Sequence, residues 1–282
     1  DERDNLWVTI GYNAAMSQHI KALILDMDGV LWRGAQSIGN LPAIFGRIRA
    51  LGLDFMLASN NATSTVETFI QRLRAFGVRI TPEQVMTSAL VTAAYLQERF
   101  PEGSPLFVVG EAGLRDILQA HGFRLLDEEA ESPPPVAVVA AMDRDITYRR
   151  LARATTWIRR GAPFIGTNPD RTYPTPQGLM PGAGSLLAAL EAASDVAPRI
   201  MGKPHPEIYH RCLERLHCRP EEVIMVGDRI ETDIHGAQRV GMRTALVLSG
   251  VTSPEQAAAC DPTPDWVVDD LETLIQTIDG GR

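Results

Sequence analysis

The sequence contains little cysteine: only Cys212, Cys218 and Cys260 occur among its 282 residues. Three cysteines cannot all pair within one chain, and their spacing matches no metal-binding pattern. Such a set is typical of proteins from a reducing compartment, where cysteine fills small apolar sites. The cysteines therefore indicate a reducing compartment and not a disulfide framework.

Long hydrophobic runs and a basic leader are also missing. No stretch approaches the roughly 20 apolar residues of a membrane span, and the chain does not open with the segments of a signal peptide. We therefore expect a soluble, cytoplasmic protein. Residues 1–15 precede Met16, which resembles an ordinary start, so we interpret them as an N-terminal extension.

Positive charge is scarce as well. Lys and Arg number 27 against 35 Asp and Glu, which gives a net charge of −8. Nucleic acids and anionic membranes require a basic field, so both are excluded as partners, whereas a small anionic substrate in a locally positive pocket is not. The sequence leaves the oligomeric state open, with a homodimer as one option.

What the sequence does contain is a regular alternation of short apolar runs and helical patterns. With 45% hydrophobic residues, the chain can bury a large core. The alternation is the signature of an α/β fold with a doubly wound, mainly parallel sheet. The predicted strands of this sheet are residues 22–26, 54–59, 223–228, 244–249 and 266–268.

The middle third of the chain is typical of a separate α/β unit, with its own strand and helix patterns. It falls between motifs that must meet in space, so we expect it to be an inserted domain. The predicted core domain comprises residues 16–99 and 183–282, and the predicted cap domain comprises residues 100–182.

Two aspartates follow the first predicted strand, in the segment LILDMDGVLW. Residues two apart share a face of a strand, so Asp26 and Asp28 point the same way at the carboxyl end, where open α/β sheets bind ligands. Gly29 permits a sharp turn and a close approach of substrate to backbone. Adjacent carboxylates repel unless a cation or a shared proton intervenes, and Mg²⁺ suits oxygen ligands. A solvated strand end is the alternative.

The segment VIMVGDRIETD adds two more carboxylates at the end of another predicted strand. Asp228 can complete a magnesium site with Asp26, and Asp233 can hold a coordinated water or anchor the loop.

Candidate phosphate ligands occur at two helix starts. Ser59 and Asn60 in LASNNAT offer hydroxyl and N–H donors, although a plain helix cap explains them equally well. Lys203 in MGKPHPEIY stands before a second helix and is either a phosphate clamp or a solvated loop residue.

In this order, DMDGVLW, SNN, GKP and GDRIETD resemble the four motifs of the haloacid dehalogenase-like (HAD) phosphohydrolases. The insertion before GKP, with GTNPD near its end and PGAGS as the return, is similar to that of the class IIA branch. That branch includes NagD-type phosphatases, p-nitrophenylphosphatases, phosphoglycolate phosphatases and pyridoxal phosphate phosphatases. The resemblance covers nearly all of residues 16–280. It implies a Rossmann-like core, a C2-type cap and a magnesium-dependent phosphatase for small phosphate monoesters such as sugar phosphates, phosphoglycolate, nucleoside monophosphates or p-nitrophenyl phosphate.

The resemblance also implies a role for each motif residue. Asp26 would be the nucleophile that forms an aspartyl-phosphate, and Asp28 the general acid and then the general base. The implied phosphate ligands are Ser59, Asn60 and Lys203. The implied ligands of Mg²⁺ are Asp26, the backbone carbonyl of Asp28, and Asp228, with Asp233 and Gly29 in support.

Other functions remain open at this point. A receiver-like signalling domain also accepts phosphate on an aspartate, but Lys203, Asp228 and a large cap argue against it. A HAD dehalogenase attacks carbon, and Asp28 favours phosphorus. An inactive scaffold has no sign in the sequence, because every expected catalytic position is filled.

The predicted cap contains a loop, GTNPDRTYPTPQGLMPG, that is rich in Pro and Gly and so has a fixed shape. We expect Arg171 and Tyr173 to contribute to leaving-group choice, and Asn168 and Asp170 to shape the loop; a simple hinge brace is the alternative. Trp32 is interpreted as a packing residue that could line the site entrance.

Overall fold

The computed structural model describes residues 19–129, 133–175 and 177–281. The proposed extension, residues 1–15, lies outside them. The chain divides into two compact units. The first contains the described residues up to Ser59, together with Phe69–Met86 and Ile208 onward; the second contains Asn60–Thr68 and Thr87–Glu207.

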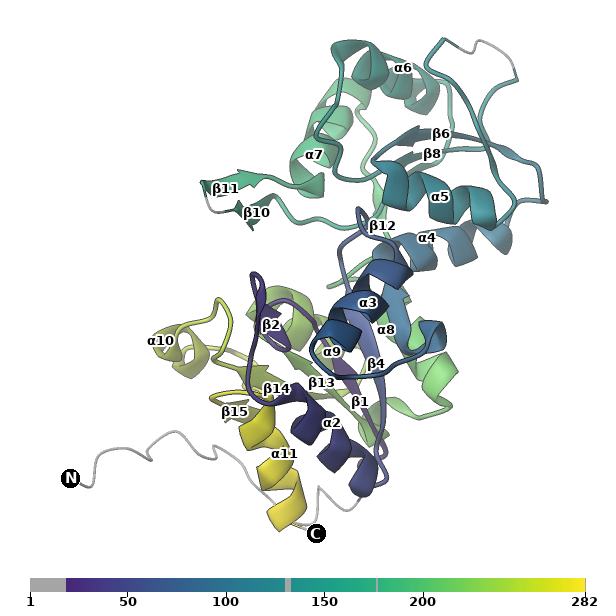
Figure 1. The fold of residues 1–282 in the computed structure, drawn as a ribbon. Helices are drawn as coiled ribbons and strands as arrows, with labels where there is room; N and C mark the ends of the chain where they lie inside the picture. Colours follow the sequence, from purple (N-terminus) through teal and green to yellow (C-terminus); the bar gives the residue numbers. More distant parts are fainter. Residues whose placement is uncertain (1–18, 130–132, 176, 282) are drawn as a thin grey trace. The chain divides into compact units, whose positions relative to one another are not determined.

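The first unit is built on a six-stranded sheet of order β15-β14-β13-β1-β4-β5 (Figure 1). From β15 to β4, each neighbouring pair is parallel. The central strands are continuous apolar runs because both faces of a parallel sheet are covered. The strands are β1 (Ala22–Leu25), β4 (Asp54–Ser59), β5 (Val85–Thr87), β13 (Val223–Gly227), β14 (Arg243–Val247) and β15 (Trp266–Val268), with a small hairpin of β2 (Trp32–Arg33) and β3 (Gln36–Ser37).

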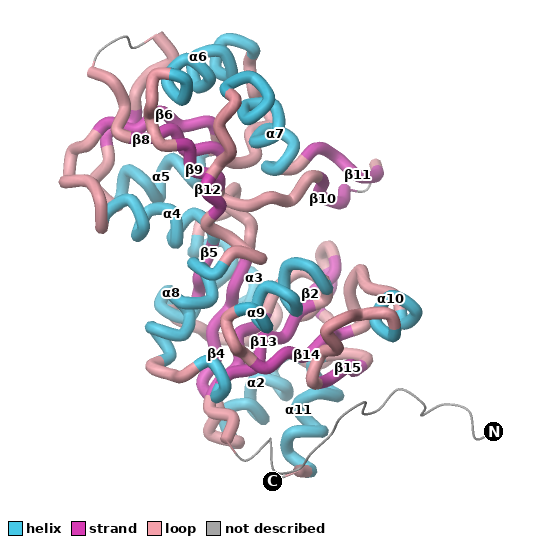
Figure 2. Tube along the Cα trace, turned by 180° about the vertical axis from the view of Figure 1, so that it is seen from behind, coloured by secondary structure: helices cyan, strands magenta, loops and turns pink. Residues whose placement is uncertain are grey.

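Two helices that are far apart in the sequence, α2 (Leu41–Ala50) and α11 (Leu271–Gly280), lie side by side on this sheet in both views (Figures 1 and 2). Each begins at a side-chain cap: Asn40 accepts the Ala43 N–H, and Asp270 accepts the Thr273 N–H at 2.8 Å. Each then buries one apolar face. The other helical segments along the core sequence are α3 (Val66–Ala75), η1 (Pro82–Gln84), α8 (Pro206–Leu216), η2 (Pro220–Glu222), the π-helical η3 (Ile230–His235), α9 (Gly236–Arg239) and α10 (Pro254–Ala258).

The second unit is built on a five-stranded sheet of order β12-β9-β8-β6-β7, in which every pair is parallel. Figures 1 and 2 show α6 and α7 together on one face of this sheet and α4 and α5 on the other. The elements are α4 (Ser88–Gln97), β6 (Pro105–Val109), α5 (Ala112–Ala120), β7 (Arg124–Leu125), β8 (Ala137–Ala140), α6 (Tyr148–Arg159), β9 (Phe164–Gly166), the hairpin of β10 (Thr172–Thr175) and β11 (Gly178–Pro181), α7 (Ala183–Ser194) and β12 (Arg199–Ile200).

The second unit extends beyond the predicted cap, residues 100–182. Three parts of the predicted core domain, α4, α7 and β12, also lie in this unit. The reason is packing: Leu187, Leu190 and Ile200 belong to the same hydrophobic core as the strands β6, β8 and β9. The architecture is nevertheless the predicted one, an α/β fold with a doubly wound parallel sheet and an inserted α/β unit.

Among the described residues, no helix is both long and apolar enough to cross a membrane.

Candidate functional site

Three neighbouring strands of the first unit end in polar residues. Asp26 follows β1, Ser59 ends β4 and Asp228 follows β13. The register aligns these ends, because Leu25 pairs with both Leu57 and Val226. The chain reverses its direction of winding at β1, so this edge is the switch point where open α/β sheets hold ligands.

Three carboxylates converge at this edge. One oxygen each from Asp26, Asp228 and Asp233 lies within 4.8 Å of the others. Asp228 and Asp233 are only 2% and 1% exposed, so their negative charges have little water to solvate them. A cation resolves the repulsion, and an all-oxygen donor set fits a hard divalent ion such as Mg²⁺. The donor set therefore fits the metal that the sequence predicts, with Asp233 as close to the group as the expected ligands.

Neighbouring loops fix the two buried carboxylates. Oδ2 of Asp228 accepts the Val251 N–H at 2.9 Å, and the Asp228 carbonyl accepts the Thr252 hydroxyl at 2.6 Å. Oδ2 of Asp233 accepts the Arg229 N–H at 3.1 Å within the loop that opens η3. These bonds orient the groups that would otherwise rotate, as outer contacts do at metal sites.

Three glycines make room for the carboxylates. A Cβ on Gly250 would lie 2.0 Å from Oδ2 of Asp228, and one on Gly29 would lie 2.3 Å from the same atom. A Cβ on Gly227 would lie 2.2 Å from the Cβ of Asp233. Gly29 also has a φ of +87°, which side-chain-bearing residues rarely adopt. The predicted support by Gly29 thus has a steric counterpart, while Gly227 and Gly250 were not predicted.

The second aspartate of DMDG has a different environment. Asp28 is solvent-exposed, and its Oδ1 accepts a hydrogen bond of 2.8 Å from Nε1 of Trp32. The guanidinium of Arg72 lies 4.1 Å from the centre of the Trp32 ring. Burial lowers the pKa of Arg72, and the nearby negative charge of Asp28 opposes that shift.

In the second unit, Asn60 binds the main chain of Lys203 at two points. Its Oδ1 accepts the Lys203 N–H at 2.8 Å, and its Nδ2 donates to the Lys203 carbonyl at 2.9 Å. Lys203 is 3% exposed. A Cβ on Gly202 would lie 2.5 Å from Oδ1 of Asn60, so this glycine permits the approach. The Asn60 side chain is thus bonded to protein, and its amide holds the lysine segment in place.

The loop after β9 joins the same cluster. Nδ2 of Asn168 donates to the Asn60 carbonyl at 2.7 Å, while its Oδ1 accepts the Asp170 N–H at 3.1 Å. Oδ2 of Asp170 accepts from Nδ2 of Asn60 at 3.2 Å. The contacts of Asn168 and Asp170 are those of residues that shape a loop.

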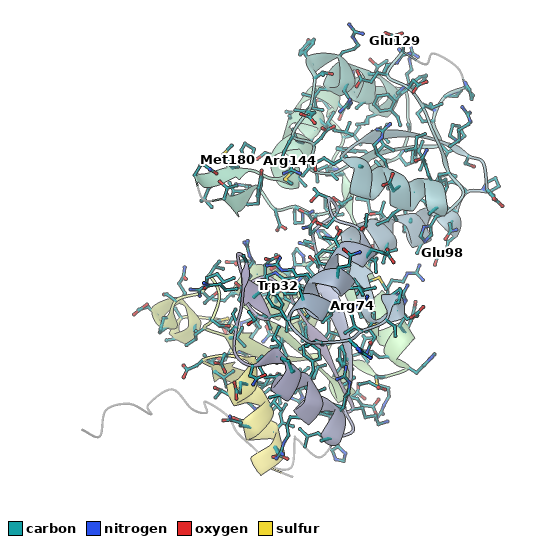
Figure 3. The ribbon with its side chains drawn as sticks, viewed as in Figure 1. Trp32, Arg74, Glu98, Glu129, Arg144 and Met180 are labelled. Atoms are coloured by element: carbon teal, nitrogen blue, oxygen red, sulfur yellow. The ribbon has the colours of Figure 1, made fainter. Side chains whose placement is uncertain are left out.

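The two candidate specificity residues lie next to β10 and in it. Arg171 is exposed, and Tyr173 is half-buried. Tyr173 is near Arg144, and Glu111 raises the pKa of Arg144 through a bidentate ion pair with both N–O distances at 2.6 Å. Arg144 is labelled in Figure 3, as is Met180 of the hairpin. Glu111 and Arg144 were not predicted from the sequence, because neither lies in a motif.

Two family models match the chain, a haloacid dehalogenase-like hydrolase model over residues 23–124 and a HAD-hydrolase-like model over residues 200–274. The acid sugar phosphatase of Staphylococcus aureus is 34% identical over 259 residues, which make up 92% of this chain and 98% of that protein. The chain belongs to the haloacid dehalogenase-like hydrolases.

Two solved structures agree with this assignment. NagD from Escherichia coli K-12 is 31% identical, with 90% of this chain and 97% of that one covered and a TM-score of 0.81. Glycerol phosphate phosphatase from Mycobacterium tuberculosis, solved in complex with magnesium, is 32% identical, with coverage of 94% and 79% and a TM-score of 0.84. The class IIA, NagD-type resemblance is confirmed.

This HAD protein is a phosphoric monoester hydrolase. The S. aureus and M. tuberculosis relatives are named as phosphatases, and they match the chain over most of its length. The receiver-like, dehalogenase and inactive-scaffold alternatives therefore lose their basis.

Proposed function

We propose that this phosphatase depends on Mg²⁺ and hydrolyses small phosphate monoesters through an aspartyl-phosphate on Asp26. The observation that carries the proposal is the convergence of Asp26, Asp228 and Asp233 at the switch point of the sheet. An oxygen-only site at this position suits phosphoryl transfer, which needs positioning and charge neutralisation more than elaborate covalent chemistry.

In the proposed reaction, a carboxylate oxygen of Asp26 attacks phosphorus, and the bond from phosphorus to the ester oxygen breaks. Asp28 donates its proton to that leaving oxygen, so an alcohol departs. The resulting Asp28 carboxylate then takes a proton from water, which attacks phosphorus. The acyl-phosphate bond breaks, and phosphate and free Asp26 are regenerated.

The proposed metal ligands are Asp26, the backbone carbonyl of Asp28, and Asp228, with Asp233 in support. When bound, Mg²⁺ supplies positive charge that neutralises the phosphoryl oxygens. The donor chemistry of the three carboxylates supports this assignment, as does the magnesium complex of the M. tuberculosis relative.

Ser59 and Lys203 are proposed to hold the phosphoryl oxygens. For Asn60 we propose a positioning role, because its side-chain amide is bonded to Lys203 and Asp170. We therefore propose that Asn60 contacts the phosphate through its backbone N–H and not through its side chain.

The proposed substrates are sugar and polyol phosphates, in line with the names of the two relatives, acid sugar phosphatase and glycerol phosphate phosphatase. Phosphoglycolate, nucleoside monophosphates and p-nitrophenyl phosphate carry the same reacting group and belong in the test. We propose that residues 100–182, as the cap, select among these leaving groups.

The direct test is a panel of these esters assayed with the purified chain after exhaustive chelation and again after addition of Mg²⁺. We expect phosphate release only with Mg²⁺, and the highest kcat/KM for a sugar or polyol phosphate. Full activity without divalent ions would contradict the proposed metal dependence, while a preference for another ester would change only the substrate class.

Replacing Asn60 with aspartate is expected to lower kcat/KM at least about tenfold. The change keeps the acceptor for the Lys203 N–H but removes both N–H donors and faces the carboxylate of Asp170. Loss of a hydrogen bond to a charged group, with a buried acceptor left unpaired, costs about 1–3 kcal/mol, and 1.4 kcal/mol is about tenfold. Steady-state kinetics with a polyol phosphate measures the loss.

The double variant Asn60→Asp/Asp170→Asn is the matched control, because it restores a donor and an acceptor between positions 60 and 170. It should recover part of the lost kcat/KM. Wild-type kinetics in Asn60→Asp would show that the contact with Lys203 has no role in the reaction.

Replacing Arg171 or Tyr173 with alanine is expected to change the ranking of esters in the panel. These residues lie at the exposed hairpin of the second unit and offer a charge and a ring to a leaving group. The rate with p-nitrophenyl phosphate should change less, because that small ester needs little from the cap. If both variants keep the wild-type ranking, the choice of leaving group is made elsewhere in residues 100–182.

A further inference from the structure

The backbone of Trp32 is held by the turn that carries Asp28. Trp32 is fully buried. Its backbone N–H donates to the Met27 carbonyl at 3.3 Å, and its carbonyl accepts the Gly29 N–H at 2.8 Å. The backbone of Trp32 is therefore tied to both sides of Asp28, which keeps the two residues next to each other.

One cationic and one aromatic neighbour contact the ring itself. The Arg72 guanidinium stacks 4.1 Å from the ring centre, and Phe76 lies 6.3 Å away between centroids. Arg72 also donates to the Gly34 carbonyl, which anchors its head group over the ring. A cation over an indole face stabilises the ring in that position.

The side chain of Asp28 has no such packing, because it is solvent-exposed. An exposed carboxylate turns freely about its two torsions unless a hydrogen bond fixes it. The bond of 2.8 Å from Nε1 of Trp32 to Oδ1 supplies that restraint from a buried donor.

Packing alone does not account for this bond. Among the residues that the structure describes, Nε1 of Trp157 and Nε1 of Trp266 are buried with no hydrogen-bond partner. The fold thus tolerates a buried indole N–H elsewhere, whereas the N–H of Trp32 is directed at an exposed acid in the DMDG motif.

We propose that Trp32 is a positioning residue for proton transfer by Asp28. Its N–H occupies Oδ1 and leaves Oδ2 as the oxygen that donates the proton to the leaving group and then accepts one from water. The inference rests on the acid and base role proposed for Asp28. It adds a residue that acts through Asp28 without contact with the substrate.

The test compares esters whose leaving groups need different help. An alkyl phosphate such as glycerol phosphate requires protonation of its leaving oxygen, whereas p-nitrophenolate departs as a stable anion. Trp32→Phe removes the N–H and keeps an aromatic ring. We expect kcat/KM for glycerol phosphate to fall about ten- to a hundredfold, as for loss of a hydrogen bond to a charged group. The kcat/KM for p-nitrophenyl phosphate should fall severalfold less, because kcat/KM covers the steps up to formation of the aspartyl-phosphate and not the later attack of water, which both esters share.

Trp266→Phe is the matched control, because it makes the same change at a buried indole of the same unit without removing a hydrogen bond. It should keep the wild-type ratio of the two kcat/KM values. Should Trp32→Phe fail to fold, site-specific incorporation of 3-benzothienylalanine at position 32 replaces the N–H with sulfur at nearly constant ring size, and the same ratio is measured.

Asp28→Asn tests the proposed acid role of Asp28 separately from the positioning role of Trp32. If it changes the ratio while loss of the N–H at position 32 does not, the inference on Trp32 is wrong and the role of Asp28 stands. If Asp28→Asn leaves the ratio unchanged, the acid role of Asp28 is wrong and the inference falls with it. A selective loss on glycerol phosphate in both variants, but not in Trp266→Phe, supports the inference.

Discussion

Asp26→Asn is expected to abolish turnover of every ester in the panel while the protein stays folded. The amide has nearly the shape of the carboxylate, so the end of β1 and its bond from the Asp26 N–H to the Val226 carbonyl should be kept. The amide oxygen is a poor nucleophile, however, and no aspartyl-phosphate can form on it. The change also removes one of the three negative charges that converge at this edge of the sheet.

The measurement has two parts. Phosphate release reports turnover, and acid quenching during hydrolysis of a radiolabelled ester reports a phosphorylated protein. The wild type should yield a labelled protein that Asp26→Asn does not, and circular dichroism should show equal folding. Turnover in pure Asp26→Asn protein near that of the wild type would exclude Asp26 as the nucleophile.

The strands that carry this site could be predicted from sequence because each is buried on both faces. Continuous apolar runs marked β1, β4 and β13, and the predicted ends agree with the structure to within one residue. The polar residues that follow them stand out against such runs. Parallel strands bring their carboxyl ends to one edge, so the convergence of Asp26 and Asp228 also followed from the pattern.

The contacts of Asn60 could not be predicted in the same way. Its side chain bonds to Asp170 and Lys203, which are 110 and 143 residues away along the chain. No periodicity encodes a pairing of that kind, since it depends on how β9 and its loop pack in the second unit. Asn60 could therefore be identified as a candidate from the sequence, but its partners Asp170 and Lys203 could not.

The predicted cap, residues 100–182, differs from the second unit at its boundary because the elements there carry a weak sequence pattern. β12 has two residues, too few for an alternating pattern, and α7, with the sequence AGSLLAALEAAS, has no strongly one-sided apolar face that would assign it to either unit. Only the packing of Leu187 and Ile200 with the strands of the second unit decides where α7 and β12 lie.

The hydrogen bond from Trp32 to Asp28 was not predicted either. A tryptophan after a turn usually packs against its neighbours, and a sequence does not show which partner its N–H finds.

The largest effect expected outside the nucleophile is that of Asp228→Ala on metal binding. The variant removes one of three converging carboxylates and leaves space between Gly29 and Gly250, which lie against the Asp228 side chain. Changing residues that merely support metal ligands costs about 10–100-fold in affinity or activity, so loss of a ligand should cost at least about 100-fold. The Mg²⁺ concentration that gives half-maximal kcat measures the loss.

A second readout avoids activity altogether. A ligand that binds only the folded state raises the melting temperature of the protein, so Mg²⁺ should raise the Tm of the wild type and have little effect on the Tm of Asp228→Ala.

Asp54→Ala is the matched control, because it deletes an exposed carboxylate from β4 of the same sheet and makes the same change in charge. It should keep both the Mg²⁺ dependence and the thermal shift of the wild type. Calcium should bind the wild-type site but inhibit it, since it takes more oxygen ligands at longer distances and would misplace the Asp26 carboxylate. An unchanged thermal shift in Asp228→Ala would show that the metal binds elsewhere, and the proposed ligand set would then be wrong even if Mg²⁺ were required.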